Sequence, residues 1–344
     1  MSEIEPDEQS ADAGLGIVTA PRHAAKTPPK RKGRRWIIPV SILVGLLVVA
    51  IVAVALAATK TTMVLNSIKR DPTLQVDDPA PVEPNQPVNI VILGSDTRGT
   101  DQGRSDVLML AHLTADRTKL YLVSFPRDMY VAIPGHGENK INAAYAFGGP
   151  ALTIKTLNQL VGVKANHAAE LDFEGFISLS DVIGGVTVNN DIAFSTGAYT
   201  FPKGPISMSG AELLAYVRER HKVPKGDLDR AHHQRMVLKA MVTKMMSKGV
   251  MTDVPTLLSV ADQVGQYVTV DSAMTNTEII NIVTSLQLGG ASSIIDLQAP
   301  ISGFGRSPAG ASIDVVDKAR MKDLATALQQ DTLDQYVTKY GTGY

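Results

Sequence analysis

The sequence predicts an α/β (α+β) fold, in which a mixed central β-sheet is flanked by helices and preceded by a single N-terminal transmembrane helix. Short apolar runs rich in β-branched residues, each closed by glycine or a turn, indicate buried strands. Longer stretches with helical periodicity follow them and indicate helices. An uncharged run at 37–58 indicates the membrane span. At 344 residues, the chain has room for one large domain or two ordinary ones.

The N-terminal part is expected to anchor the chain in the cell membrane as a single-pass protein. Residues 1–36 are polar, acidic first and basic later, which is typical of a disordered cytoplasmic tail. Residues 37–58 are long enough to cross a hydrocarbon core at about 1.5 Å per residue. The basic residues before this run keep the tail cytoplasmic, so the C-terminal domain should be extracytoplasmic. A cleaved signal peptide is the alternative, since "ALAAT" contains an A-x-A pattern, but the apolar run is long and starts late.

Residues 59–87 are expected to form an extracytoplasmic, proline-rich linker. Five prolines within 71–87 favour an extended, semi-rigid spacer of at most about 50 Å, at 3.1 Å per residue. Such a spacer would hold the folded part near the membrane.

The globular pattern begins at Val88 and is expected to run to residue 335 as one domain. Strands are predicted at 88–94, 106–113, 119–125, 186–190 and 292–300. Helices are predicted at 148–162, 172–185, 207–216, 229–249, 276–290 and 315–332. Ser209 is expected to cap the third of these helices, with Glu212 three residues on. The alternation of strands and helices favours an α/β or α+β domain.

The composition excludes several classes of site. The chain has no cysteine, which excludes disulfides, zinc fingers and thiol catalysis. Its formal net charge is -1, so it is not a globally basic nucleic-acid binder, and no nucleic-acid partner is expected. Any site for an anion must therefore come from local clustering of basic residues.

The stretch "GSDTRGTDQGRSD" (94–106) leaves one predicted strand and enters the next. It matches neither a P-loop nor a dinucleotide fingerprint. It does interleave carboxylates, which suit hard cations, with guanidinium groups, which grip phosphate oxygens: Asp96, Arg98, Asp101, Arg104 and Asp106. A metal and phosphate site is one interpretation, and a polar turn with mutually neutralising charges is the other.

A second charged stretch covers 124–150. Arg127 and Asp128 come just after a predicted strand, while Lys140 and Asn142 follow a turn rich in proline and glycine. Loops at the carboxyl ends of strands are where α/β sheets bind ligands. A surface salt bridge would explain Arg127 and Asp128 equally well.

The third stretch, "YVRERHKVPKGDLDRAHHQ" (216–234), is rich in basic residues. If the preceding helix ends at Tyr216, Arg218 and Arg220 lie on an extended segment and can converge as a clamp. The turn that follows would bring Asp227, Arg230 and Gln234 back at a helix N-terminus, which favours anions. Seven of the eleven arginines after the predicted span lie within 98–127 and 218–235, if Arg117 is set aside as a turn residue. This concentration favours a polyanion pocket.

The histidines do not indicate a metal site. His232 and His233 are adjacent, so on a helix they point about 100° apart, and no H-x-x-x-H spacing accompanies them. They are interpreted as structural or solvated residues. His136, in a glycine-rich turn, is interpreted as a loop residue.

Four stretches in this order, 89–110, 122–150, 172–186 and 214–234, resemble the LytR-CpsA-Psr family of cell-wall enzymes. The resemblance covers about 88–240, which would be the motif-bearing core. It implies a phosphotransferase that moves a glycopolymer of teichoic acid, capsule or arabinogalactan type from a polyprenyl-pyrophosphate carrier to peptidoglycan. Polyprenyl phosphate would be released, and the lipid-linked glycan, the peptidoglycan acceptor and the membrane would be the partners.

The resemblance also implies roles for individual residues. Asp96 and Asp106 match the carboxylates that bind Mg²⁺, with Mn²⁺ as a substitute. Asp227 and Gln234 match polar partners that close the pyrophosphate site. Arg104, Arg127 and Asp128 are the expected catalytic residues, with Asp128 or Asp96 as candidate proton acceptor. The expected pyrophosphate-binding residues are Arg98, Arg104, Arg127, Lys140, Asn142, Arg218, Arg220, Asp227, Arg230 and Gln234.

Two alternatives to the transferase stay open: a hydrolase that acts on the same carrier with water as acceptor, and a non-catalytic wall-binding or regulatory module. One departure from the family pattern concerns 233–235. The family commonly has arginine and then two glutamines, whereas this chain has His233, Gln234 and Arg235. The geometric expectation is that the 94–106 loop and the 216–234 stretch meet around one magnesium ion.

Overall fold

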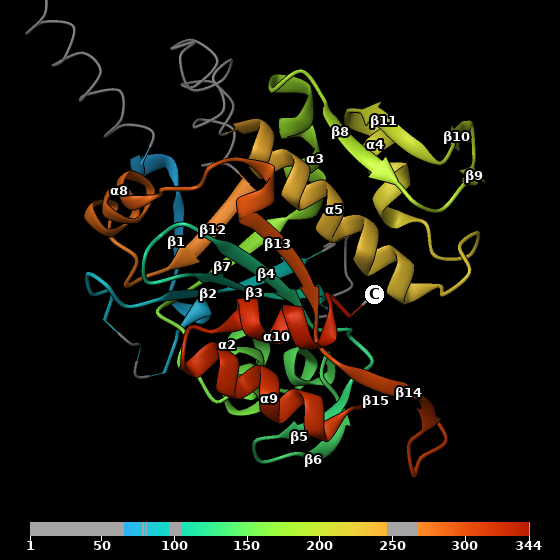
Figure 1. Cartoon of the computed structure of the whole chain (residues 1–344). Helices are drawn as coiled ribbons and strands as arrows, with labels where there is room; N and C mark the ends of the chain where they lie inside the picture. Colours follow the sequence, from blue (N-terminus) through green and yellow to red (C-terminus); the bar gives the residue numbers. More distant parts are fainter. Residues whose placement is uncertain (1–64, 78, 80, 96–104, 246–266, 344) are drawn as a thin grey trace, which may run out of the picture. The chain divides into compact units, whose positions relative to one another are not determined.

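A seven-stranded mixed sheet forms the centre of the fold, in the strand order β1-β12-β7-β2-β3-β4-β13 (Figure 1). The computed structural model describes residues 65–77, 79, 81–95, 105–245 and 267–343. The strands of the sheet are β1 (Lys69–Asp71), β2 (Val88–Ser95), β3 (Ser105–Leu113), β4 (Leu120–Ser124), β7 (His167–Asp172), β12 (Val268–Asp271) and β13 (Ile294–Gln298). This sheet, flanked by helices, confirms the predicted α/β architecture of the folded part.

Both faces of the sheet are buried, because its strands alternate between two apolar cores. In β3, Val107, Met109 and Ala111 face one core, while Leu108 and Leu110 face the other. Side chains of successive strand residues point to opposite faces, so an almost wholly apolar strand fits a sheet covered on both sides. The five strands predicted from apolar runs are all present, within one or two residues of the predicted bounds.

Helices cover each face (Figure 1). On the face of Leu108 lie α2 (Ala143–Val161), α9 (Lys318–Gln329) and α10 (Leu333–Tyr340). On the face of Val107 lie α3 (Phe173–Val182), α4 (Gly210–Arg218) and α5 (Asp227–Met245). A further helix is α8 (Asn276–Ser285), and short 3-10 turns occur at Pro72–Leu74 and Ala291–Ser293.

Four two-stranded sheets complete the described elements. Two of them flank the candidate site: β5 (Tyr130–Ile133) with β6 (Gly137–Lys140), and β14 (Ile301–Arg306) with β15 (Ser312–Val316). The others are β8 (Val186–Asn190) with β11 (Gly204–Met208), and β9 (Phe194–Thr196) with β10 (Tyr199–Phe201).

The strand directions bring several chain segments to one edge of the sheet. β2 is parallel to β7, β4 is parallel to β13, and β3 runs antiparallel to both β2 and β4. The carboxyl ends of β2, β4, β7 and β13 and the start of β3 therefore share one edge, which we call the carboxyl edge. There the register shifts between Gly94 and Ser95, which leaves Asp106 as an extra residue in β3. Such bulges are common beside active sites.

Several predicted helix bounds are wrong. Residues 204–208 form strand β11, which pairs with β8, so the helix predicted at 207–216 begins at Gly210 and continues to Arg218. Ser209 does hold the N-cap position, but its side chain makes no capping hydrogen bond. Likewise, the start of the helix predicted at 315–332 belongs to β15, and α9 begins at Lys318 behind an Asp317 cap.

The other predicted helices are shifted or shortened. The helix predicted at 148–162 begins earlier, at Ala143, and is kinked at Gly148 and Gly149 before Pro150. The helix predicted at 229–249 begins at Asp227 and is described to Met245. The helix predicted at 276–290 ends at Ser285.

The expected linker is partly wrong as well. Residues 69–71 form β1, which pairs with β12, and Leu74 is fully buried in the core. The folded part therefore begins at least at Lys69 and not at Val88. At the other end it continues past 335, because Tyr336 of α10 is buried in the same core.

All described elements lie within the unit Leu56–Tyr344. The expected cytoplasmic tail and the expected span at 37–58 lie outside the described residues. Within the described ranges, no helix is long and apolar enough to cross a membrane.

Candidate functional site

A chain of alternating charges joins three segments at the carboxyl edge. The turn after β4 carries Arg127 and Asp128, Lys140 ends β6, and Asp227 begins α5. Lys140 Nζ lies 2.8 Å from Asp128 Oδ1. Arg127 Nε lies 3.1 Å from Asp227 Oδ2 and 3.9 Å from Asp128 Oδ2. Residues that come from the second and third charged stretches of the sequence thus form one cluster.

Backbone hydrogen bonds hold the turn that carries Arg127 and Asp128. The N–H of Phe125 donates to Leu108 O at 2.9 Å, which continues the pairing of β4 with β3 to the strand end. The N–H of Asn142, just before α2, donates to Arg127 O at 3.2 Å. Because both sides of the turn are anchored, its charged side chains start from a fixed backbone.

Asp227 joins two arginines at the N-terminus of α5. Its Oδ1 lies 2.8 Å from Arg230 Nη2, and its Oδ2 forms the ion pair with Arg127 described above. A carboxylate is favoured at a helix N-terminus, where the helix dipole is positive. The side chains are mostly buried, with Arg230 only 10% exposed, so these pairs are less screened than surface pairs.

Asp314, in β15, also belongs to this cluster, and the sequence analysis missed it. Its N–H donates to Asp128 O at 2.9 Å, and Met129 and Asp314 form an isolated β-bridge. Burial, followed by the negative charges of Asp128 and Asp227, raises the pKa of Asp314 to about 6. The only signal in the sequence is an aspartate within the short apolar strand "SIDVV".

Gln234 ties α5 to α4 beside Arg218, the last residue of α4. Gln234 is buried, and its Nε2 donates to Val217 O at 3.4 Å. Arg218 lies in the last turn of α4 and is half-buried, whereas Arg220 is exposed and its Nε donates to His221 at 3.2 Å. The condition for a two-arginine clamp is not met, because the helix continues two residues beyond Tyr216.

His233 occupies an aromatic stack, which confirms its structural interpretation. Its ring is buried, with centroids 4.3 Å from Tyr216 and 5.1 Å from Phe194. Burial, and then the neighbouring His232, lower the pKa of His233 to about 4, so the ring is neutral at pH 7. His232 pairs with Asp191 instead, at 3.3 Å. His136 stacks on Phe147, as expected of a loop residue.

Arg235 is a buried cation behind the charge cluster. It is 1% exposed, and its Nη1 donates to Ser124 Oγ at 2.6 Å, at the end of β4. Burial lowers its pKa to about 10, against the opposing charge of Asp296. Arg235 therefore stays charged and supports the strand that leads into the Arg127 turn.

The predicted metal loop is largely outside the described residues. Asp96, Arg98, Asp101 and Arg104 all lie there. Asp106 is placed by its backbone at the β3 bulge, on the same edge as Arg127. Within the ranges that the structure describes, no group of three or more histidine, aspartate or glutamate side chains could hold a metal ion.

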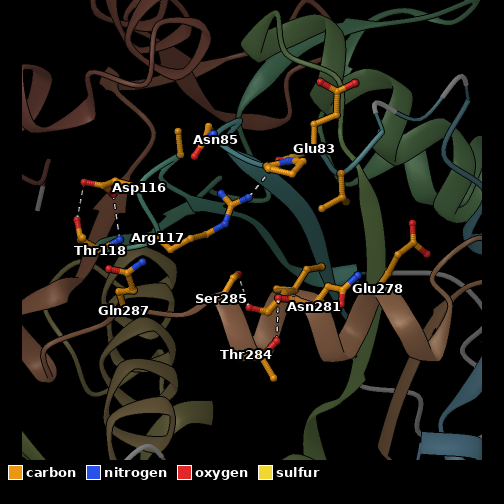
Figure 2. A pocket seen from close by; sticks show the side chains of 14 residues that line it. Glu83, Asn85, Asp116, Arg117, Thr118, Glu278, Asn281, Thr284, Ser285 and Gln287 are labelled. Atoms are coloured by element: carbon orange, nitrogen blue, oxygen red, sulfur yellow. Dashed lines mark hydrogen bonds between the residues drawn. The ribbon is translucent and has the colours of Figure 1, made fainter.

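A cavity lined mainly by polar side chains lies at the opposite edge of the sheet, away from the charge cluster (Figure 2). Its volume is about 760 Å³, and it lies between α8, the β3–β4 turn and the segment before β2. Arg117 in this wall donates to Gln86 O at 2.7 Å and Thr114 O at 2.9 Å, so it holds the turn together. None of the predicted site residues lines this cavity.

Comparison with known proteins supports the same family as the motifs. The model of the LytR_cpsA_psr family matches residues 54–330. The polyisoprenyl-teichoic acid–peptidoglycan teichoic acid transferase TagU of Bacillus mycoides is 40% identical over 178 residues, which are 52% of this chain and 59% of TagU. TagU of Oceanobacillus iheyensis is 35% identical over 223 residues, 61% of this chain and 69% of that protein. The match thus spans little more than half of the Bacillus relatives.

Solved structures agree with these matches. The crystal structure of B. subtilis TagV has a TM-score of 0.62 and 25% identity, and the match covers 72% of this chain and 98% of TagV. TagT bound to LI-WTA has a TM-score of 0.59 and 26% identity, with 77% and 99% covered. The family model covers most of the chain, so the chain belongs to the LytR-CpsA-Psr family.

Proposed function

We propose that this protein is a phosphotransferase that moves a glycopolymer from a polyprenyl-pyrophosphate carrier to a hydroxyl group of peptidoglycan. The observation that carries this proposal is the convergence of Arg127, Lys140 and Arg230 from three segments at the carboxyl edge. The names of the TagU relatives and the TagT complex with LI-WTA support the same class of reaction.

The cluster suits a substrate with two adjacent negative charges. A pyrophosphate diester carries two charges, and cleavage of its bridging bond places more charge on the departing oxygen. Guanidinium and ammonium groups that are already held in place stabilise this charge without reorganisation. Asp128 and Asp227 hold these cations in place, since each forms an ion pair with one or two of them.

We propose that Asp96 and Asp106 bind Mg²⁺, for which Mn²⁺ can substitute. Carboxylate oxygens are the ligands that such hard cations prefer, and the bulge at Asp106 lies on the edge that carries Arg127. When bound, the ion would neutralise charge on the phosphate oxygens. The function further assumes a single membrane span at 37–58 and an extracytoplasmic domain, which would place the site near a lipid-linked donor.

A labelled lipid-linked donor tests the reaction. The full-length protein in detergent or vesicles is incubated with the donor, with and without peptidoglycan, in the presence of Mg²⁺ or EDTA. The proposal expects label on peptidoglycan, only with the metal. Free glycan in both reactions identifies a hydrolase instead, and peptidoglycan binding without turnover identifies a non-catalytic module.

Variants connect the reaction to the cluster. Arg127→Ala is expected to reduce transfer at least about a hundredfold, because it removes preorganised charge from the transition state. Arg320→Ala, a half-exposed arginine on α9, is the matched control and should keep the wild-type rate. Equal rates for the two variants would contradict the proposed site.

A further inference from the structure

Asp314 brings a third carboxylate to the charge cluster from a separate part of the chain. It lies in β15 of the C-terminal hairpin, and its backbone is fixed to the Arg127–Asp128 turn by the bond from its N–H to Asp128 O. Its side chain is close enough to sense the charges of Asp128, Asp227, Lys140 and Arg127. The hairpin therefore forms one wall of the candidate site.

The three carboxylates of the cluster differ in how they are engaged. Asp128 is held by Lys140, and Asp227 by Arg127 and Arg230. Asp314 is 8% exposed, yet within the described part of the chain no ion pair or hydrogen bond engages its carboxylate. Burying a carboxylate without a partner costs stability. Its presence among preorganised cations indicates a functional role more than a structural one.

The proposed reaction requires one group of this kind. The departing polyprenyl phosphate is a stable anion and needs no proton, because the second pKa of a phosphate monoester is about 6. The acceptor hydroxyl, in contrast, must lose its proton when it attacks. A base whose lone pairs are already committed to cations is poorly suited to accept that proton, which disfavours Asp128 and Asp227.

We propose that Asp314 is the general base of the transfer, an inference that rests on the proposed function. The acceptor oxygen forms a bond to the glycan-bearing phosphorus, while the bond from that phosphorus to the bridging oxygen breaks. Polyprenyl phosphate leaves with the electron pair of that bond. The proton of the acceptor hydroxyl passes to Asp314 and then to water, so the products are a phosphodiester, polyprenyl phosphate and one proton.

The environment of Asp314 fits this role. Burial and the facing charges of Asp128 and Asp227 raise its pKa to about 6, while Lys140 and Arg127 oppose this shift. A general base works best when its pKa lies near the working pH. At pH 7 most Asp314 side chains would be deprotonated and still more basic than an ordinary aspartate.

The pH dependence of transfer tests the assignment. Wild type, Asp314→Asn and Asp314→Glu are compared with labelled donor and peptidoglycan between pH 5 and 8. Wild-type kcat is expected to rise with pH through about 6. The kcat of Asp314→Asn should be about 10²- to 10⁴-fold lower and should no longer rise with pH through about 6, while donor binding stays unchanged. Asp314→Glu should recover part of the rate, and Asp334→Asn, an exposed aspartate on α10, should behave as wild type.

Several outcomes would overturn the inference. One is an Asp314→Asn variant with the wild-type rate, or with a lower rate but the same acidic limb. Another is a drop in melting temperature that accounts for the lost activity and that Asp314→Glu shares. If wild type releases free glycan without labelling peptidoglycan, the proposed function fails, and Asp314→Asn then tests the same proton transfer with water. Absence of any turnover by wild type overturns both proposals.

Discussion

Arg127 Nε lies 3.1 Å from Asp227 Oδ2, which joins the turn after β4 to the first residue of α5. The two residues belong to different charged stretches that lie far apart in the sequence. Their contact joins the second and third stretches at one edge of the sheet. Whether the 94–106 loop joins them around a metal ion stays a prediction, because most of that loop lies outside the described residues.

Asp227→Ala tests the importance of this contact. The change leaves Arg127 and Arg230 without the carboxylate that orients both of them, in a mostly buried setting. We expect transfer to fall at least about a hundredfold and the free energy of unfolding to fall by about 1–3 kcal/mol. Urea unfolding and the donor assay measure the two effects. Asp191→Ala, which removes an exposed partner of His232, should change neither by as much.

Asp314→Asn is expected to stabilise the protein at neutral pH. Folding raises the pKa of Asp314 from its ordinary value of 3.8 to about 6, so the folded state binds a proton more tightly than the unfolded state. The protonated Asp314 side chain therefore contributes fully to stability below about pH 4, and this contribution is lost as the pH rises through about 6. Replacing the carboxylate should recover about 1–3 kcal/mol at pH 7.5, and nothing at pH 4. Denaturant unfolding at both pH values provides the measurement, and a lower stability of the variant at pH 7.5 contradicts this account.

Asp271→Ala should destabilise the sheet. The carboxylate is 2% exposed, and it accepts hydrogen bonds from His167 Nδ1 at 3.1 Å and from the N–H of Ala168 at 3.0 Å. Although burial opposes it, these hydrogen bonds keep the pKa of Asp271 below its ordinary value. We expect a loss of about 2–4 kcal/mol at pH 7, because buried donors would lose their acceptor.

The stabilisation by Asp271 has a defined pH range. Because the pKa of Asp271 is lower in the folded than in the unfolded state, its carboxylate stabilises the folded state above about pH 4, the pKa in the unfolded state. This stabilisation is lost as the pH falls toward the pKa in the folded state. The difference between wild type and Asp271→Ala in chemical denaturation should therefore shrink below pH 4. A difference that is constant from pH 7 to pH 3 would show that packing alone is responsible.

Phe304→Ala is expected to weaken the acceptor interaction. Phe304 pairs directly with Asp314 across the β14–β15 hairpin, and 69% of its surface is exposed. An exposed aromatic ring offers an apolar face that a sugar ring can cover. We expect KM for peptidoglycan to rise about tenfold, with the melting temperature and donor binding unchanged. Phe147→Ala, another exposed phenylalanine, is the matched control, and a similar effect there would remove the special role of Phe304.

The sheet could be predicted from the sequence because its strands are continuous apolar runs. Residues 106–113 alternate between two cores, so nearly every position is apolar, and the ends are marked by turns. The start of the helix predicted at 207–216 was wrong because pairing of 204–208 with β8 overrides the local helical pattern. No local signal in a single segment reveals such a partner.

The candidate site, like the fold, could be predicted from the sequence only in part. Arg127, Lys140, Asp227 and Arg230 stand in recognisable motifs, and the structure joins them in one cluster. Asp314 could not be predicted, since its place depends on one bridge between β15 and the turn at Met129. The structural interpretation of His233 follows from the absence of any metal-ligand spacing in the sequence, and its ring stacks on Tyr216.

The pairing of β1 with β12 has a consequence for how the protein is made. Arg70 Nε donates to Met274 O, 204 positions later, and β13 enters the sheet beside β4 only after that. The motif-bearing core at 88–240 therefore lacks three strands of its own sheet, β1, β12 and β13, and is not expected to fold alone. Because the chain is synthesised from its N-terminus, the sheet can be completed only after the last third of the chain has been made. Pairing between strands that are so far apart in the sequence slows folding. Until the last strands are added, the half-built sheet would expose open strand edges, so we expect folding of this protein to depend on protection of its unfinished form.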